Sequence, residues 1–307
     1  MSKLNKAKQG CYIGDICANA FAYADDIVIL SPSCSALRYL ISICEIFAKD
    51  FEMIFNPEKC TLLIFTNSEF IKNNTSIVLC GKKVKIVNKE THLGHVLNSD
   101  YCHTSTLVNI DNVIRDMKVR TNAIVNNFKP VSWKSKATLF NSQCLSLYGC
   151  PLWRLDDNNV EKLCTTWKVC CRRLLNLNPR TRSHLIPQLM ETAPILDIIM
   201  QRILNLVLDG LNHENNMIKN FFKNSLLSNT SYMSTNVNKI IRCFNINYLE
   251  LFSYNKNKLK IKLKEKTGIK DWQCNMIEEL LYMRESYLEA NLDRGEIYTM
   301  LEDLSTT

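Results

Sequence analysis

Proline and glycine are scarce in this 307-residue sequence, which contains seven prolines and eight glycines. So few turn-forming residues disfavour an all-β fold with many tight turns and favour long helices. No run of 18 or more apolar residues occurs, so we expect no membrane-spanning helix. Residues 1–10 are polar and basic, unlike a secretory signal, and we therefore expect an intracellular protein, in the nucleus or the cytoplasm.

Closely spaced cysteine pairs are also missing, although the sequence has 14 cysteines. No Cys-x-x-Cys motif occurs between Cys11 and Cys274. Without a secretory signal, we interpret these cysteines as reduced residues of the core. His92, His95 and Cys102 lie near one another in the sequence, but they lack the ligand spacing of structural zinc sites.

The remaining composition supports a folded core, since 46% of the residues are hydrophobic and 22% are charged. Hydrophobic periodicity predicts a helix from Ser33 or Ser35 to about Met53, with either serine as its N-cap. Period-two patterns then predict strands, and from Thr104 the periodicity is helical. The predicted strands are 61–65, 76–80, 83–87 and 93–97, and the predicted helices are 104–127, 132–149, 158–177 and 194–212. We therefore predict an α+β fold.

Asp25 and Asp26 lie side by side in an otherwise apolar run, FAYADDIVIL, at residues 21–30. A buried, unpaired carboxylate is costly, and two adjacent ones also repel each other. The run predicts a strand, a tight turn and a buried second strand at 27–30, with both acids at the tip. Such carboxylates suit Mg²⁺, which combines one or two of them with water and substrate phosphate. Alternatively, both acids simply form a solvated turn.

The sequence Tyr23-Ala24-Asp25-Asp26 between hydrophobic flanks resembles the catalytic hairpin of reverse transcriptases. Residues 27–33 resemble the jockey-type branch, from retrotransposons that lack long terminal repeats. Further segments extend the resemblance over about residues 10–210: FNPEKC at 55–60, HLGHVL at 92–97, LYG at 147–149 and TRS at 181–183. It implies a partial polymerase palm with a primer grip at 1–100, a helical thumb at 101–190 and a helical C-terminal region at 191–307.

The resemblance also implies roles for individual residues. Asp25 and Asp26 would bind Mg²⁺, or Mn²⁺ in its place, for the two-metal nucleotidyl transfer of an RNA-directed DNA polymerase. Lys59 would lie near the leaving pyrophosphate and protonate it. The residues implied to contact the DNA primer or the RNA template are Tyr23, Leu93, Gly94 and His95.

Positive charge is concentrated in the middle of the sequence. Residues 101–190 contain 13 Lys and Arg against five Asp and Glu, an excess of eight that equals the net charge of +8. Lys118, Arg172 and Arg173 lie among apolar residues on predicted helices, where they would follow a phosphate backbone. The alternative is an ordinary solvated helix face.

Two patterns mark the C-terminal region. A lysine recurs at every second position from Lys256 to Lys266, which predicts a strand with one lysine face. That face either protects a sheet edge or contacts nucleic acid. Residues 271–303 are acidic and carry apolar residues at helical spacing, which predicts an amphipathic helix that docks on the basic surface or on a partner.

A third palm carboxylate is missing from the first 24 residues, where Asp15 is the only acid and is interpreted as a turn residue. The nucleotide-binding fingers of the family are missing as well. We therefore expect a reverse transcriptase fragment with no independent polymerase activity, active only when the missing half is supplied. The alternatives are a non-catalytic RNA- or DNA-binding remnant that uses residues 101–190, and an inert fragment that aggregates.

Overall fold

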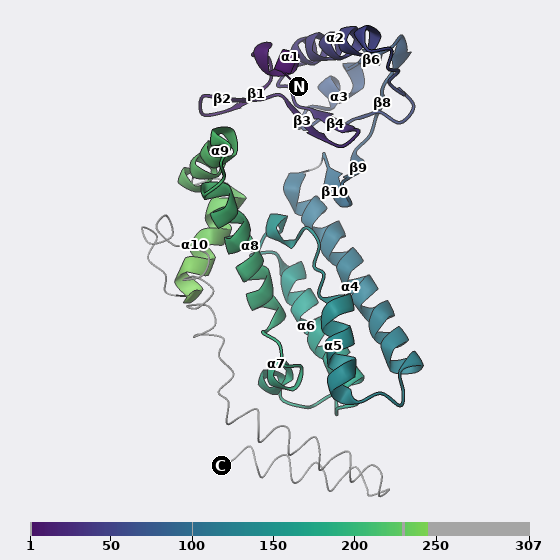
Figure 1. Ribbon diagram of the computed structural model, residues 1–307, viewed down its shortest axis with the longest axis vertical. Coiled ribbons are helices and arrows are strands. Elements are labelled where there is room, and N and C mark those ends of the chain that lie inside the picture. The colour runs from purple at the N-terminus through teal and green to yellow at the C-terminus, as the bar shows by residue number, and fades with distance from the viewer. Residues whose placement is uncertain (1, 100, 229–230, 245–307) are drawn as a thin grey trace, which may run out of the picture. The chain divides into compact units, whose positions relative to one another are not determined.

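The computed structural model describes residues 2–99, 101–228 and 231–244, which form a mixed α+β fold (Figure 1). Two compact units divide these residues. Unit 1 consists of the residues up to Asn112, of Gly149–Asn159 and of the residues from Ile203 onward, whereas unit 2 consists of Val113–Tyr148 and Val160–Arg202. The units therefore do not follow the successive segments 1–100, 101–190 and 191–307, because the middle segment contributes to both.

The strands of unit 1 pair mainly as short antiparallel hairpins with two-residue turns. These hairpins are β1 (Cys11–Ile13) with β2 (Ile16–Ala18), β3 (Ala20–Tyr23) with β4 (Asp26–Ile29), β6 (Val78–Leu79) with β7 (Lys82–Lys83), and β9 (Lys89–His92) with β10 (His95–Asn98). In addition, β5 (Thr61–Leu62) pairs in parallel with β8 (Lys85–Ile86). Each hairpin turn contains at least one residue with positive φ, as the favoured two-residue turns require.

Helix α2 (Cys34–Asp50) anchors the N-terminal part of unit 1, together with α1 (Ser2–Lys6) and α3 (Glu69–Asn74). It begins after the N-cap Ser33, whose Oγ accepts a hydrogen bond from the Ala36 backbone N at 3.3 Å, so the predicted cap is confirmed. One buried cluster joins α2 to α1 and β3, and a second lies beside it. Their buried members are Leu4, Ala20, Leu40 and Cys44, and Ile77, Leu79 and Val84.

The rest of the described chain is helical. Its helices are α4 (Tyr101–Asn127), α5 (Trp133–Cys144), α6 (Asn158–Leu174), α7 (Ile186–Leu189), α8 (Ile195–Leu211), α9 (Asn216–Leu227) and α10 (Tyr232–Phe244). In unit 2, Phe140, Leu163 and Trp167 form part of the buried core. Arg202 donates a hydrogen bond to the Leu145 carbonyl (2.8 Å), at the end of α5 where carbonyls lack partners within the helix.

Most predicted helices are confirmed, with small shifts at their ends. Helices α4, α6 and α8 end within three residues of the predicted boundaries, whereas α5 ends at Cys144 rather than at residue 149. The strand predicted at 61–65 is only two residues long, and the one predicted at 93–97 is a turn followed by β10. The predicted lysine-rich strand at 256–266 and the acidic helix at 271–303 lie outside the described residues. None of the described helices combines the length and the apolar character needed to span a bilayer.

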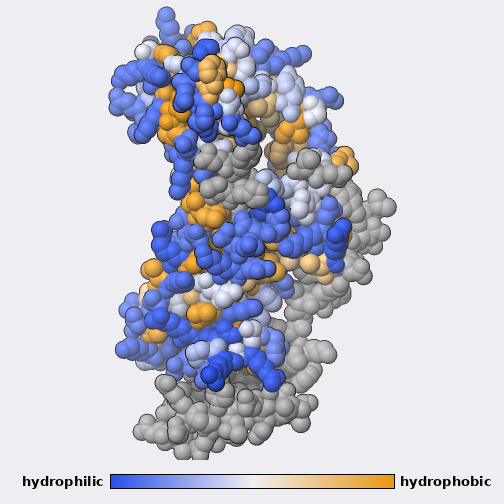
Figure 2. All heavy atoms as spheres, turned by 180° about the vertical axis from the view of Figure 1, so that it is seen from behind, coloured by the Kyte–Doolittle hydropathy of each residue, from blue (hydrophilic) through white to orange (hydrophobic). Residues whose placement is uncertain are grey.

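Several large apolar side chains of unit 1 remain in contact with solvent. Ile54 is 93% exposed and Phe70 is 76% exposed, and Phe51 and Phe65 are also exposed. Figure 2 shows apolar side chains interspersed among hydrophilic ones on the face opposite to that of Figure 1. Apolar side chains that are scattered in this way are common on protein surfaces.

Candidate active site

The β3–β4 hairpin places Asp25 in its two-residue turn and Asp26 at the start of β4 (Figure 1). Tyr23 pairs with Asp26 in the strand register, so the turn consists of Ala24 and Asp25. Ala24 has a φ of 53°, in the left-handed region that such a turn requires at its first position. The two adjacent acids therefore lie together at the tip of one hairpin, as the sequence predicts.

The opposite end of the hairpin is held by Asn19, whose side chain is buried. Asn19 Nδ2 donates a hydrogen bond to the Leu4 carbonyl (2.6 Å), and the Asn19 carbonyl accepts one from the Leu30 N (2.8 Å). Ala20, the first residue of β3, is buried in the cluster with Leu40. The hairpin therefore extends from a fixed base.

The tip of the hairpin is open to solvent. Tyr23 is 68% exposed, and Asp25 and Asp26 are exposed as well. The prediction of a buried strand at 27–30 is wrong, because Ile27 is 45% exposed and the residues after it are only partly buried. The physical reason is that only the base of the hairpin packs on the core, through Ala20 and the partly buried Ile29, whereas the residues nearer its tip extend beyond the core.

Carboxylate oxygens are ligands that Mg²⁺ prefers, and the ion takes its remaining oxygen ligands from water and phosphate. Within the described residues, no group of three or more His, Cys, Asp or Glu side chains could hold a metal ion. Asp15 is exposed in the β1–β2 turn, where a turn residue was predicted. The described residues therefore supply no third ligand of this kind beside Asp25 and Asp26.

Lys59 lies in a turn just before β5. Its backbone N donates a hydrogen bond to the Asn56 carbonyl (3.2 Å), and the Glu58 N donates one to Asn56 Oδ1 (3.0 Å). Glu58 forms an ion pair with Lys82 at 3.0 Å, whereas Lys59 is exposed and has no ion pair in the part of the chain that the structure describes. The Lys59 ammonium group is therefore accessible to an anionic partner.

The β9–β10 hairpin reverses direction through Leu93 and Gly94. His92 pairs with His95, and the two turn residues have φ values of 48° and 74°. Positive φ at both positions is the signature of a type I′ turn, which favours Asn-Gly. Leucine is strained in this region, and backbone strain of this kind concentrates at functional sites. Leu93 is also 40% exposed, so the tip of this hairpin is accessible.

The imidazole of His95 is half-buried and packs inside unit 1. Burial lowers the pKa of His95, and its Nε2 lies 3.3 Å from Nδ2 of Asn109 on α4. A Cβ atom at Gly149 would lie 2.6 Å from His95 Nδ1, so the ring occupies the space that this glycine leaves open. The accessible part of the predicted primer grip is therefore Leu93 and Gly94. The His95 side chain instead packs inside unit 1 and holds the hairpin in place.

Asn109 holds β10 through two hydrogen bonds to the backbone of Val96. Its Oδ1 accepts from the Val96 N, and its Nδ2 donates to the Val96 carbonyl, both at 3.0 Å. We expect Asn109→Ala to lower the free energy of unfolding by about 2–4 kcal/mol, because two buried backbone groups lose their partners. Urea denaturation measures this loss. Asn126→Ala, at an exposed position of the same helix, is the control and should change stability by less than about 0.5 kcal/mol; equal effects would contradict the role of Asn109.

Leu93→Asn is expected to stabilise the β9–β10 turn. Asparagine tolerates the left-handed region better than leucine, so relief of strain should raise the free energy of unfolding by about 1 kcal/mol. Urea denaturation of the full chain again measures the change. A loss of stability would show that the Leu93 side chain contributes packing that outweighs the strain of its backbone.

Unit 2 carries the excess of positive charge. Its described segments contain 13 Lys and Arg against four Asp and Glu, a difference of nine. Lys118 on α4 and Arg173 on α6 are both exposed. Burial raises the pKa of the Cys170 thiol on α6.

Arg172, in contrast, is used within unit 2. Its Nη2 donates hydrogen bonds to the Thr181 carbonyl (2.7 Å) and to Ser183 Oγ (2.9 Å). These hydrogen bonds hold the loop that follows α6 and involve the first and last residues of the TRS motif at 181–183. A bound phosphate would compete with them, so Lys118 and Arg173 are the better placed of the three predicted cations.

The predicted site residues other than Lys59, which lies alone in the turn before β5, form three groups. Tyr23, Asp25 and Asp26 share one hairpin of unit 1, Leu93, Gly94 and His95 share another, and Lys118, Arg172 and Arg173 belong to unit 2. No sequence pattern indicated the supporting role of Asn109. No protein-family model matches this chain, and a search of curated proteins found no match either.

Proposed function

We propose that this chain is the C-terminal part of a reverse transcriptase of the jockey type, from a retrotransposon without long terminal repeats. The observation that carries the proposal is the β3–β4 hairpin, whose exposed two-residue turn presents Asp25 and Asp26 beside Tyr23. The fixed base at Asn19 supports it further, because a metal-binding tip must be held in place to position a substrate. The second hairpin, with its strained turn at Leu93, is consistent with a primer grip.

In this proposal Asp25 and Asp26 hold a divalent cation, which when bound supplies activation of the primer 3′ hydroxyl and stabilisation of the leaving pyrophosphate. The ammonium group of Lys59 donates a proton to that pyrophosphate. Leu93 and Gly94 position the backbone of the DNA primer, and Tyr23 contacts it beside the carboxylates. The two-metal reaction needs a further carboxylate, so we propose activity only when another polypeptide segment supplies it.

The second candidate function is non-catalytic binding of RNA or DNA. It is favoured by the excess of positive charge in unit 2, to which the exposed Lys118 and Arg173 contribute. A surface of this kind releases counterions from a phosphate backbone, so its affinity falls steeply with salt. The third candidate is an inert fragment that aggregates, because the exposed apolar side chains of unit 1 would promote aggregation.

Primer extension on an RNA template with a DNA primer, in Mg²⁺ or Mn²⁺, tests the enzymatic proposal. We expect no extension by the chain alone and extension when the fingers and the first palm strand of a jockey-type enzyme are fused ahead of it. A salt titration of RNA binding tests the second candidate, since an affinity that does not change with salt would exclude a phosphate-binding surface.

A further inference from the structure

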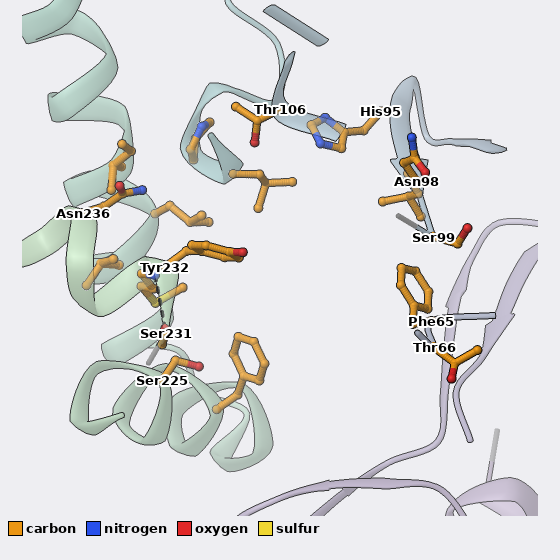
Figure 3. A pocket seen from close by; sticks show the side chains of 18 of the residues that line it. Phe65, Thr66, His95, Asn98, Ser99, Thr106, Ser225, Ser231, Tyr232 and Asn236 are labelled. Atoms are coloured by element: carbon orange, nitrogen blue, oxygen red, sulfur yellow. Dashed lines mark hydrogen bonds between the residues drawn. The ribbon is translucent and has the colours of Figure 1, made fainter. Parts of the chain in front are cut away.

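Unit 1 contains a cavity of about 790 Å³ at the side of β10 (Figure 3). Its walls come from β10, the residues just before α3, the end of α8, and α9 and α10. This volume lies within the range of small-molecule sites, which is about 300–1,000 Å³. The cavity involves neither the carboxylates of the β3–β4 hairpin nor the basic residues of unit 2, and it shares only His95, the half-buried residue of the β9–β10 hairpin, with the predicted polymerase residues.

The lining of the cavity is apolar and aromatic, with uncharged polar groups. Aromatic rings come from Phe65, Phe221 and Tyr232, and aliphatic side chains include Leu97 and Val207. Asparagine, serine and threonine side chains and the imidazole of His95 supply hydrogen-bonding groups, and no Asp, Glu, Lys or Arg is among the lining residues. Burial lowers the pKa of His95, which favours its neutral form. A charged ligand would lose its hydration here without gaining an opposite charge, so the lining selects an uncharged one.

Two lining residues present polar groups around the open space. Figure 3 shows Tyr232 and Phe65 on opposite sides of the cavity, with the Tyr232 hydroxyl directed into it. Ser99, which is 5% exposed, has a buried Oγ without a hydrogen-bond partner among the described residues. A ligand with a polar group therefore has both a directed hydroxyl and an unsatisfied one to bond.

The walls are held in place by contacts outside the cavity. Arg154 lies over the Tyr232 ring, with its guanidinium carbon 4.8 Å from the ring centroid. Asn236 on α10 donates to the Trp153 carbonyl (2.7 Å) and accepts from the Leu155 N (3.0 Å). Asn109 likewise holds β10 through its two hydrogen bonds to the backbone of Val96. Preformed walls lower the ordering cost of binding.

We propose that this cavity is a binding site for an uncharged, planar aromatic small molecule that carries one hydrogen-bonding group. The ring system fills the space between Phe65 and Tyr232, and the polar group bonds to the Tyr232 hydroxyl. Stacking and edge contacts with aromatic side chains supply affinity, and the hydrogen bond selects among ligands of the same shape.

Equilibrium dialysis of the full chain with 1-naphthol and with naphthalene tests the proposal. We expect saturable binding of both at one site, with 1-naphthol bound up to about tenfold more tightly because of its hydroxyl. Tyr232→Phe should remove that preference and leave naphthalene binding unchanged. An absence of saturable binding, or a preference that survives in Tyr232→Phe, would overturn the proposal.

A matched pair of variants on α9 locates the site. Ser225 lines the cavity, whereas Leu227 does not and is 71% exposed. Ser225→Trp should fill the space and weaken binding of both probes at least about tenfold, and Leu227→Trp should leave binding unchanged. Circular dichroism of both variants checks that they are folded. Equal binding by the two folded variants would show that the probes bind elsewhere and would overturn the assignment.

Discussion

Asp25→Asn is expected to abolish primer extension by the chain fused behind the fingers and the first palm strand of a jockey-type reverse transcriptase. The amide removes one of the two carboxylate ligands at the hairpin tip and lowers the negative charge that holds the cation. Because a metal ligand at the reacting phosphate is lost, we expect the extension rate to fall by more than about 100-fold. The assay is extension of a labelled DNA primer on an RNA template, in Mg²⁺ and in Mn²⁺.

Asp15→Asn is the matched control for this experiment. Asp15 is also an exposed acid in a two-residue hairpin turn, and it undergoes the same change from carboxylate to amide. We expect its variant to extend primers at the rate of the unaltered fusion. Extension by Asp25→Asn at that same rate would contradict a catalytic role for the β3–β4 hairpin and would leave the solvated turn as the better interpretation.

Charge reversal at Lys118 and Arg173 is expected to weaken RNA binding strongly. Replacing both with glutamate removes two cations from the basic surface of unit 2 and adds two repelling charges. We expect an affinity loss of about 100-fold at low salt. We also expect the slope of log affinity against log salt concentration to decrease in magnitude by about two. Fluorescence anisotropy with a labelled RNA, measured over a range of salt concentrations, gives both quantities.

Lys49→Glu with Lys85→Glu is the control for net charge. Both lysines are exposed in unit 1, and the double change alters the charge of the chain by the same amount. If binding depends on the basic surface of unit 2, this control should lose much less affinity than the Lys118 and Arg173 variant. Equal losses would mean that only the total charge of the chain attracts RNA, with no defined binding surface.

Local features of the fold could be predicted from the sequence because they depend on neighbouring residues. Ser33 caps α2 as expected, since its side chain bonds to a backbone N three residues later. The β3–β4 turn falls at Ala24 and Asp25, between two apolar segments. Burial of residues 27–30 was predicted wrongly because it depends on which distant segments pack against the hairpin, and a local pattern does not encode these contacts.

The supporting contacts of the candidate site could not be predicted, because they join residues far apart in the sequence. Asn109 bonds to Val96 across the hairpin–helix junction, and Gly149 leaves room for the His95 ring. Helical periodicity alone marks Asn109 as one polar residue among several on α4. The cavity beside β10 is likewise assembled from separate segments, so neither its volume nor its uncharged lining is visible in a local pattern.

Binding of Mn²⁺ to the full chain, followed by paramagnetic broadening of backbone amide signals, tests the cation site at Asp25 and Asp26 most directly. Mn²⁺ substitutes for Mg²⁺ at carboxylate sites and broadens nearby signals. We expect low concentrations to broaden the amides of residues 23–27 first, and Asp25→Asn to prevent this without affecting signals elsewhere. Broadening that spreads evenly over the exposed acids of the chain, or that persists in the variant, would contradict the account.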